Sequence, residues 1–258
     1  MQRPENLLDT IEAGATRGEH ITVVRVLNTA SGENATVTVS HGDLFPPLAD
    51  RKLAEQVLSA VQNLATQGGV ANLVDALDEK GSPVTLAIEI IRPKLELLIF
   101  GGGHVGQAVA LIGALMGYDV TVVDDREEFA SRARLPDPRI GLLVSDYASA
   151  AGKVTISSGT VVVIVTRGHQ YDELCLKSVV GSRAAYIGMI GSRRRVMSVF
   201  KKLVAEGFSE RDLQRVHAPI GLRIGARTPQ EIAVSILAEI IDHVNNPDHE
   251  HKGETNAI

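Results

Sequence analysis

A glycine-rich turn between a strand and a helix is the feature that most constrains the fold of this chain. The segment LLIFGGGHVGQAVALIGALMGYDVTVVDD occupies residues 97–125, and Gly101, Gly103 and Gly106 match the pattern G-x-G-x-x-G. The match follows an apolar strand and opens a helix, and Asp124 stands roughly twenty residues further on, at the end of the next strand. Together these features predict the first βαβ unit of a parallel, Rossmann-like sheet.

Each glycine of the turn has its own physical role in this prediction. Gly101 permits the tight turn, Gly103 lets backbone N–H groups approach a pyrophosphate, and Gly106 lets the helix pack closely on the strand. The helix N-terminus adds about half a positive charge, so it stabilises an anion without any lysine. The candidate binding residues of this loop are Gly101, Gly102, Gly103, His104, Val105 and Gly106. A turn that only packs the helix against the strand is the alternative.

Three side chains near this turn bear on which ligand it holds. Asp124 is placed to accept a hydrogen bond from a ribose hydroxyl, whereas Arg126 is placed to meet an extra phosphate, so the sequence does not separate NAD from NADP. His104 lies among the first helical N–H groups, where the helix dipole disfavours its protonation. Contact with a ligand and a capping or packing role are both open for His104.

Beyond residue 94 short apolar strands alternate with helices, which is the pattern of a parallel sheet with crossover helices. The expected strands cover residues 96–100, 119–123, 140–144, 161–166 and 185–189. The expected helices begin near His104, Glu128, Asp172, Ser192, Ser209 and Thr228. The predicted fold class is therefore α/β, with a Rossmann-like doubly wound parallel sheet.

The chain before this sheet has a different pattern. Alternating strands are expected at 21–27, 35–40 and 84–91, and an amphipathic helix at 50–67. A turn of Arg92, Pro93 and Lys94 marks the expected boundary. We predict three parts: a small N-terminal α+β domain over 1–93, a Rossmann-like nucleotide- or cofactor-binding domain over 94–246, and a disordered tail over 247–258.

Three polar residues follow the expected strand at 161–166, namely Arg167, His169 and Asp172. Ligands of open α/β sheets bind at the carboxyl ends of the strands, so the topology directs these residues toward the same crevice as the glycine loop. A helix-capping role for Asp172 and a surface position for His169 are the alternatives.

A basic turn follows the expected strand at 185–189. Gly191, Ser192, Arg193 and Arg194 lie where that strand has ended and the next helix begins. Basic side chains in a first turn oppose the helix dipole. A bound anion such as a phosphate removes this conflict, with Ser192 and the free N–H groups helping to hold it. A solvated basic face is the alternative.

The composition disfavours several classes of function. The chain has 258 residues, 44% of them hydrophobic, and a formal net charge of −5, which argues against bulk binding to nucleic acid. Cys175 is the only cysteine, so no intrachain disulfide and no metal-type cysteine pair can form. No apolar run approaches the roughly 18 residues of a membrane span, and the polar N-terminus lacks a signal core. We expect a cytoplasmic protein that binds neither membrane nor nucleic acid, with no metal site and no catalytic residue that the sequence identifies.

Five motifs resemble the xanthine dehydrogenase accessory proteins of the XdhC/CoxI type. In chain order they are GGGHVGQA, VDDREEFASRARLPD, TRGHQYD, IGMIGSRRR and HAPIGLRIGARTPQEIAVSILAEI, within residues 95–244. Such an ordered set is far more specific than a lone glycine pattern. The part before residue 94 departs from the family, because it contains neither an Arg-Pro-Pro-Gly-like nor a Gly-Gly-Cys-Val-Glu-like stretch.

The resemblance implies a non-catalytic chaperone that binds molybdenum cofactor (molybdopterin). Such a protein holds the cofactor while a cysteine desulfurase exchanges its terminal oxygen for sulfur, and then passes it to the apoenzyme of a xanthine dehydrogenase-type molybdenum hydroxylase. His104, His169, Arg193 and Arg194 are then the candidates to contact the phosphate, dithiolene or oxo groups. A homodimer is a further expectation.

Two other functions remain open from the residues. An NAD(P)-dependent oxidoreductase is favoured by the complete glycine pattern, although no tyrosine is followed four residues later by lysine. A nucleotide-binding sensor, whose N-terminal module transmits occupancy to a partner protein, is the third. Retention of a pterin without turnover of NAD(P)H separates the chaperone from both.

Overall fold

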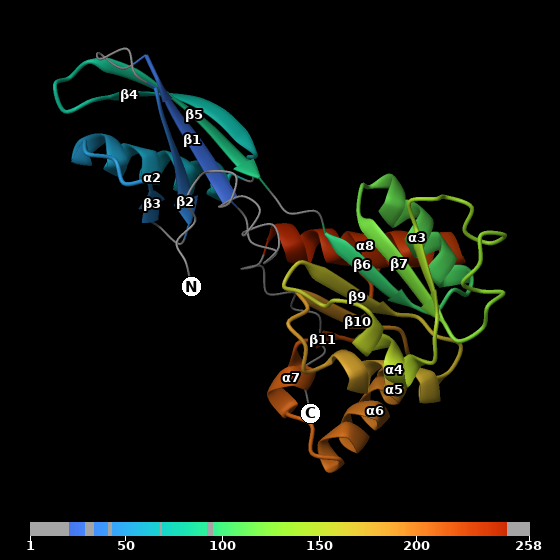
Figure 1. The fold of residues 1–258 in the computed structure, drawn as a ribbon. Coiled ribbons are helices and arrows are strands. Elements are labelled where there is room, and N and C mark those ends of the chain that lie inside the picture. The colour runs from blue at the N-terminus through green and yellow to red at the C-terminus, as the bar shows by residue number, and fades with distance from the viewer. Residues whose placement is uncertain (1–20, 29–33, 41–42, 68, 92–94, 247–258) are drawn as a thin grey trace. The chain divides into compact units, whose positions relative to one another are not determined.

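The structure is a computed structural model that describes residues 21–28, 34–40, 43–67, 69–91 and 95–246. The chain forms two compact units, Met1–Pro93 and Lys94–Ile258, which are described in turn (Figure 1). The disordered tail predicted at 247–258 lies outside the described residues. Among the described helices, none has the length and apolar character that crossing a membrane requires.

The N-terminal unit is an antiparallel sheet with one helix packed against it. The strand order is β3-β2-β1-β5-β4. The strands are β1 (Ile21–Leu27), β2 (Ala35–Ser40), β3 (Asp43–Phe45), β4 (Ala71–Leu77) and β5 (Pro83–Ile91). Helix α2 (Arg51–Thr66) begins after Asp50, whose side chain accepts the N–H of Leu53 and so caps the helix. The predicted hairpin, helix and last strand are present, whereas the sequence did not predict β3 and β4.

The C-terminal unit is a six-stranded parallel sheet with the strand order β11-β10-β9-β6-β7-β8. In sequence order the strands are β6 (Glu96–Phe100), β7 (Asp119–Asp124), β8 (Gly141–Val144), β9 (Thr160–Ile164), β10 (Tyr186–Met189) and β11 (Val216–His217). Counted from β6, this is the strand order of a dinucleotide-binding Rossmann sheet. The predicted fold class is therefore confirmed.

Helices cover both faces of this sheet (Figure 1). On one face α3 (His104–Leu115) and α8 (Pro229–Asn245) pack side by side. The other face carries α4 (Tyr147–Ala150), α5 (His169–Val179), α6 (Arg193–Ala205) and α7 (Glu210–Gln214). Because the chain leaves β6 through α3 on one face and β9 through α5 on the other, the topology switches between these neighbouring strands. Open α/β sheets bind ligands at such a switch point, beyond the carboxyl ends of the strands.

The helix predicted to begin near Glu128 is wrong, because residues 125–140, which we call the β7–β8 loop, form successive turns. Pro136 and Pro138 lack backbone N–H donors and interrupt a helical ladder in the second half of the loop. In the first half the guanidinium of Arg126 donates hydrogen bonds to Asp124, the last residue of β7. The predicted start of α5 near Asp172 also moves, to His169.

Candidate functional site

Three of the four glycines in the loop after β6 are required by the packing of the fold. Gly101 has a φ of +111°, and a Cβ there would lie 2.5 Å from the carbonyl oxygen of Val165. A Cβ on Gly106 would collide with the carbonyl oxygen of Gly101, and one on Gly102 with that of Phe129. The close approach at Gly101 places the end of β9 against the end of β6, and the close approach at Gly106 places α3 there, as the glycine pattern predicts.

Gly103 differs from the other three, because a Cβ there would meet no atom within 4 Å. It is the N-cap of α3, and it provides no side chain to cap the helix. The first intrahelical bond runs from the N–H of Gln107 to the carbonyl of Gly103 at 2.8 Å. The N–H groups of His104, Val105 and Gly106 therefore have no acceptor inside the helix, and no side chain caps them.

His104 is the first residue of α3, and its side chain is exposed at this open end of the helix. The first turn of α3 contains no acidic side chain. The partial positive charge of the helix end is thus not neutralised by a carboxylate of its own turn.

Asp124 ends β7 and is fully buried. Its carboxylate accepts the N–H of Gly102 at 2.9 Å and the backbone N–H of Arg126 at 3.0 Å. The guanidinium of Arg126 adds two hydrogen bonds, from Nε at 2.9 Å and from Nη2 at 3.1 Å. Burial opposes ionisation of Asp124, but these hydrogen bonds outweigh it and hold its pKa below the usual value. Asp124 thus fastens the glycine loop to the β7–β8 loop.

The ring of Phe129 lies between two guanidinium groups. The Cζ atoms of Arg126 and Arg134 are 3.4 Å and 4.1 Å from its centroid. Two guanidinium groups this close to one ring cannot share a face of it, so they occupy opposite faces. The stacked side chains lie next to the acid that ends β7, and the Phe129 carbonyl lies directly against Gly102.

Arg167 connects the strand ends on either side of β6. It follows β9, and it donates from Nη1 and Nη2 to the two carboxylate oxygens of Asp125, which follows β7, at 3.0 and 2.8 Å. Nη2 also donates to the hydroxyl of Tyr171 at 2.7 Å, and the guanidinium stacks 4.3 Å from that ring's centroid. Because β6 lies between β7 and β9 in the sheet, the ion pair spans the carboxyl end of β6.

Asp172 lies in the first turn of α5 and is buried. Its Oδ1 accepts the hydroxyl of Thr166 at 2.5 Å, which ties the end of β9 to the start of α5. The N-cap residue is Gly168, and no side-chain hydrogen bond caps this helix. The geometry therefore does not favour a capping role for Asp172. His169 is the first residue of α5, and its side chain lies outside the part that the structure describes.

The basic turn after β10 opens α6. Ser192 is the N-cap of this helix, and its Oγ accepts the N–H of Arg195 at 3.3 Å. Ser192, Arg193 and Arg194 are exposed, and Gly191 is half-buried. The first turn has no acidic side chain. This placement fits a bound anion and a solvated basic face equally well.

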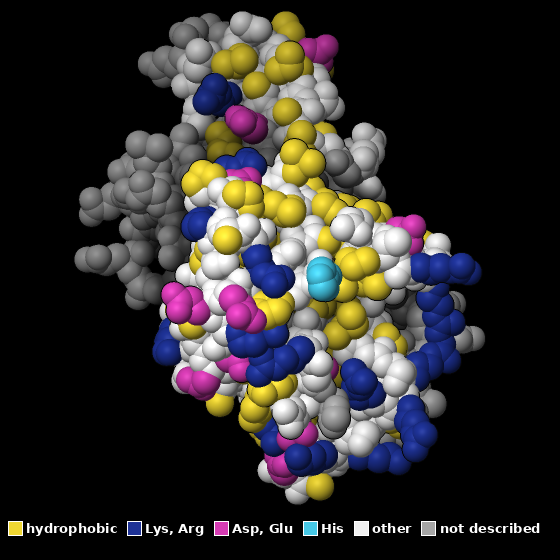
Figure 2. Space-filling model, turned by 90° about the vertical axis from the view of Figure 1, so that its right-hand side faces the viewer, with side chains coloured by type: hydrophobic (Ala, Val, Ile, Leu, Met, Phe, Trp, Pro, Cys, Tyr) yellow, Lys and Arg dark blue, Asp and Glu magenta, His cyan; other side chains and the backbone are white. Residues whose placement is uncertain are grey.

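Helices α3, α5 and α6 all begin at one edge of the sheet, after β6, β9 and β10. Figure 2 looks onto this edge, where Lys and Arg side chains are spread widely and Asp and Glu side chains occupy less of the surface. The predicted site residues lie along it, but they differ in accessibility. Asp124 and Asp172 are buried, whereas Arg126 and Arg167 are engaged by carboxylates of the β7 end.

Sequence reasoning missed three residues of this edge: Asp125, Phe129 and Tyr171. Asp125 is the second acid of the VVDD strand end, and Tyr171 stands four residues after Arg167, the spacing at which helical side chains meet. Both signals were present in the sequence. The position of Phe129 depended on the irregular β7–β8 loop, for which the pattern predicted a helix.

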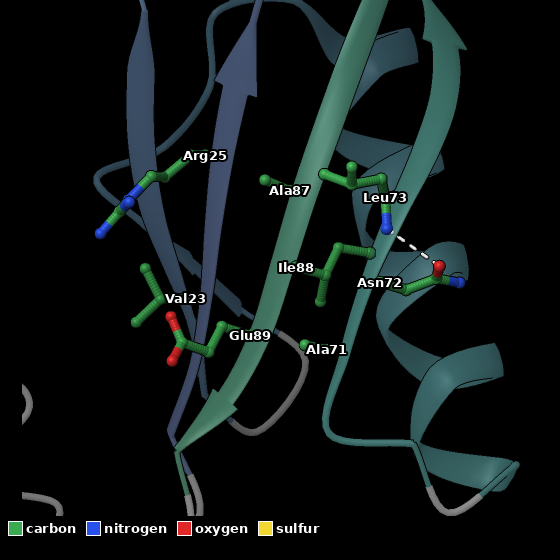
Figure 3. A pocket seen from close by; sticks show the side chains of 8 residues that line it. All are labelled: Val23, Arg25, Ala71, Asn72, Leu73, Ala87, Ile88 and Glu89. Carbon is green, nitrogen blue, oxygen red and sulfur yellow. Dashed lines mark hydrogen bonds between the residues drawn. The ribbon is translucent and has the colours of Figure 1, made fainter.

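A separate hollow of about 330 Å³ lies on the sheet of the N-terminal unit (Figure 3). Arg25 of β1 and Glu89 of β5 contribute its charged side chains, and most of the remaining lining is apolar. Leu73 on the edge strand β4 is 70% exposed beside it. None of the residues predicted to bind a ligand lines this hollow.

Comparison with known proteins identifies the family of the C-terminal unit. Residues 97–240 match the family model described as the XdhC Rossmann domain. The chain belongs to this family. The match covers more than half of the chain and includes the glycine loop, the β7–β8 loop and the basic turn, so the resemblance predicted from the motifs is confirmed.

Relatives of this XdhC-family chain include three curated bacterial proteins. The uncharacterized protein YqeB of Escherichia coli K12 is 32% identical over 80% of the chain and 38% of its own length. A probable xanthine dehydrogenase subunit of Bacillus subtilis 168 is 29% identical over 60% of the chain and 44% of its own length. The molybdenum cofactor insertion chaperone PaoD of Escherichia coli K12 is 25% identical over 58% of the chain and 40% of its own length. The chain thus matches less than half the length of each.

A solved structure has the same fold. A crystal structure described as a xanthine dehydrogenase from Bacillus halodurans superposes with a TM-score of 0.66, covering 93% of this chain and 67% of that one. The sequence identity is 22%, so the likeness bears on the fold alone.

Proposed function

We propose that this XdhC-family chain is an accessory protein that binds molybdenum cofactor by its phosphate end and helps deliver it to a molybdenum hydroxylase of the xanthine dehydrogenase type. One relative is named a molybdenum cofactor insertion chaperone, and the name of another describes it as part of a probable xanthine dehydrogenase. The cofactor is cargo in this proposal, and the chain has the role of a carrier and not of a catalyst.

The open end of α3 is the observation that carries the proposal. The helix begins at Gly103 with no side-chain hydrogen bond to cap its free N–H groups, and a Cβ at this position would point into open space. A phosphate fits this cradle, because it accepts several N–H bonds at once and is stabilised by the helix dipole. The other glycines of the loop are needed for packing, whereas the openness at Gly103 is not.

The arginines at the same edge extend the anion site. Arg167 presents a guanidinium over the end of β6, and Arg193 and Arg194 lie at the start of α6. Guanidinium groups bind phosphate oxygens in pairs of hydrogen bonds. These residues hold and orient the phosphate end, while the molybdenum centre undergoes oxygen-to-sulfur exchange by a cysteine desulfurase before transfer to the apoenzyme.

Isothermal titration calorimetry with molybdopterin tests the proposal. The wild-type chain is expected to bind with a dissociation constant that rises by about tenfold or more when Gly103 is replaced by valine, because the side chain occupies the phosphate position. Equal affinities of the two proteins would show that the N-terminus of α3 does not bind the phosphate.

An NAD(P)-dependent oxidoreductase is the second candidate, and the glycine pattern after β6 favours it. Its test is turnover of NADH or NADPH by the purified chain in the presence of carbonyl compounds. A steady rate that disappears in the Gly103→Val variant would favour the oxidoreductase. Tight nucleotide binding without turnover and without pterin would favour a nucleotide sensor.

A further inference from the structure

In a sheet of this strand order, a dinucleotide binds in two halves. The pyrophosphate lies on the first helix, and the adenosine ribose lies beside the second strand, where it bonds to the acid at that strand's end. In this chain the two positions correspond to the N-terminus of α3 and to Asp124 at the end of β7.

Asp124 has no oxygen available for a ribose. Its side chain has no exposed surface, and both carboxylate oxygens already accept hydrogen bonds, from the Gly102 N–H and from Arg126. An acid that binds a ribose diol must present a carboxylate oxygen to the crevice. Here the whole carboxylate holds the protein's own loop.

The β7–β8 loop packs against the glycine loop and Asp124, on the side of the sheet where the general geometry places the adenosine. The Phe129 carbonyl packs on Gly102, and the Phe129 ring lies between the guanidinium groups of Arg126 and Arg134. The loop is anchored at its far end by Leu135 and Ile140, which are fully buried. The position of the loop on this side is therefore fixed by core packing and does not depend on a single side chain.

From this geometry we infer that the crevice is closed on its β7 side and selects ligands held by phosphate groups without an adenosine ribose. This inference rests on the proposed phosphate site at α3 and narrows its ligand. With the β7 side filled, the accessible part of the edge runs from the end of β6 toward β9 and β10. A phosphate monoester of a compact head group fits this half, whereas the ADP-ribose part common to NAD and NADP needs the half that the protein itself occupies.

The closed half can be opened by substitution. Replacing Arg126 and Phe129 together by alanine removes the guanidinium that covers Asp124 and the ring that lies beside it. Titration with ADP-ribose should then show an affinity at least about tenfold higher than that of the wild-type chain, because a ribose diol gains hydrogen bonds to a charged carboxylate. The affinity for inorganic pyrophosphate should stay the same, because the two substitutions leave α3, Arg167 and the start of α6 unchanged.

Arg139→Ala is the matched control, because Arg139 belongs to the same loop but pairs with Asp137, away from Asp124. It should leave the affinity for ADP-ribose at the wild-type value. An opened variant that gains no affinity for ADP-ribose overturns the inference, and so does wild-type binding of ADP-ribose that is lost in Asp124→Asn.

A measurement on the wild-type chain covers the case in which the double variant does not fold. In an NMR titration the Gly102 N–H and the Arg126 Nε–H signals should not shift with ADP-ribose, whereas the amides of His104 and Val105 should shift with pyrophosphate. A shift of the Gly102 N–H or Arg126 Nε–H signal with ADP-ribose overturns the inference that the β7 side is closed. Failure of pyrophosphate to move the second pair counts against the proposed phosphate site instead, so the two failures are distinguishable.

Discussion

Arg167 and Asp125 form a bidentate ion pair across the carboxyl end of β6, with N–O distances of 3.0 and 2.8 Å. The fork of a guanidinium matches a phosphate as well as a carboxylate. A phosphate on the glycine loop therefore competes with Asp125 for Arg167. Asp125 holds Arg167 in position in the free protein, and it reduces the free energy that Arg167 contributes to phosphate binding.

Replacing Asp125 by asparagine should strengthen phosphate binding. The change weakens the hold on Arg167 and removes a negative charge from the crevice, so the affinity for pyrophosphate should rise about threefold at low salt, and less at high salt. Calorimetry at two ionic strengths measures this. Asp137→Asn, which disrupts a similar ion pair with Arg139 in the same loop, should have no effect. A weaker or unchanged affinity in Asp125→Asn would contradict the competition.

Substitution by alanine should destabilise the protein much more at Gly106 than at Gly103. At Gly106 a methyl group meets the carbonyl of Gly101, and the resulting overpacking should lower the free energy of unfolding by about 2 kcal/mol or more. At Gly103 the methyl group points into open space, and the loss should stay within about 1 kcal/mol. Phosphate affinity should fall in the stable Gly103→Ala variant. Thermal denaturation measures the stability of both variants, and calorimetry measures their affinity for phosphate. Equal losses of stability would contradict the distinction between a packing role of Gly106 and an open position at Gly103.

Asp124 should make the stability of the C-terminal unit depend on pH in acid. Its pKa is lowered in the folded state, so folding favours the carboxylate. The contribution is complete above the unfolded pKa near 4 and is lost as the pH falls through the lowered folded value. In Asp124→Asn the loss of unfolding free energy should be about 2 kcal/mol at pH 7 and should shrink toward pH 3. Urea denaturation across this range measures it.

The exposed Glu127 provides the control for that experiment, since it is an acidic residue three positions after Asp124, in the β7–β8 loop. Glu127→Gln should leave the free energy of unfolding at pH 7 close to the wild-type value. A pH-independent difference between wild type and Asp124→Asn would mean that the charge of Asp124 does not stabilise the loop.

Replacing Arg193 and Arg194 by alanine distinguishes an anion-binding role of the basic turn from a solvated basic face. If the turn holds an anion, the double alanine variant should lose affinity for pyrophosphate by about tenfold, and the salt dependence of binding should decrease. Arg211→Ala, an exposed change in α7, should change neither. Wild-type affinity in the double variant would assign both side chains to a solvated face.

The fold class was predictable because its signals are local and strong. The glycine pattern after an apolar strand, and the capping box of Thr228 and Glu231 at the start of α8, each determine their structure within a few residues. The edge strand β4 was not predictable in this way. Its outer positions Leu73 and Leu77 are exposed apolar residues, so the expected alternation of buried apolar and exposed polar residues is missing.

The β7–β8 loop shows why the rest of the site was not predictable. Its residues have helix-forming composition around Glu127 and Glu128, but the two hydrogen bonds of the Arg126 guanidinium to Asp124 and the stacking on Phe129 hold the chain in turns. These are tertiary contacts that no local pattern encodes. The sequence placed Asp124 correctly at the strand end and suggested a ribose partner for it. Its burial by the loop became visible only in three dimensions.

Mass spectrometry of the small molecules that copurify with the full wild-type chain and with Gly103→Val identifies the ligand directly. The wild type is expected to retain a pterin phosphate, and the variant, equally folded, is expected to have lost it. Equal retention by both proteins, or a wild type that carries NAD(P) and no pterin, would contradict the claim that the open end of α3 holds the phosphate of a molybdenum cofactor.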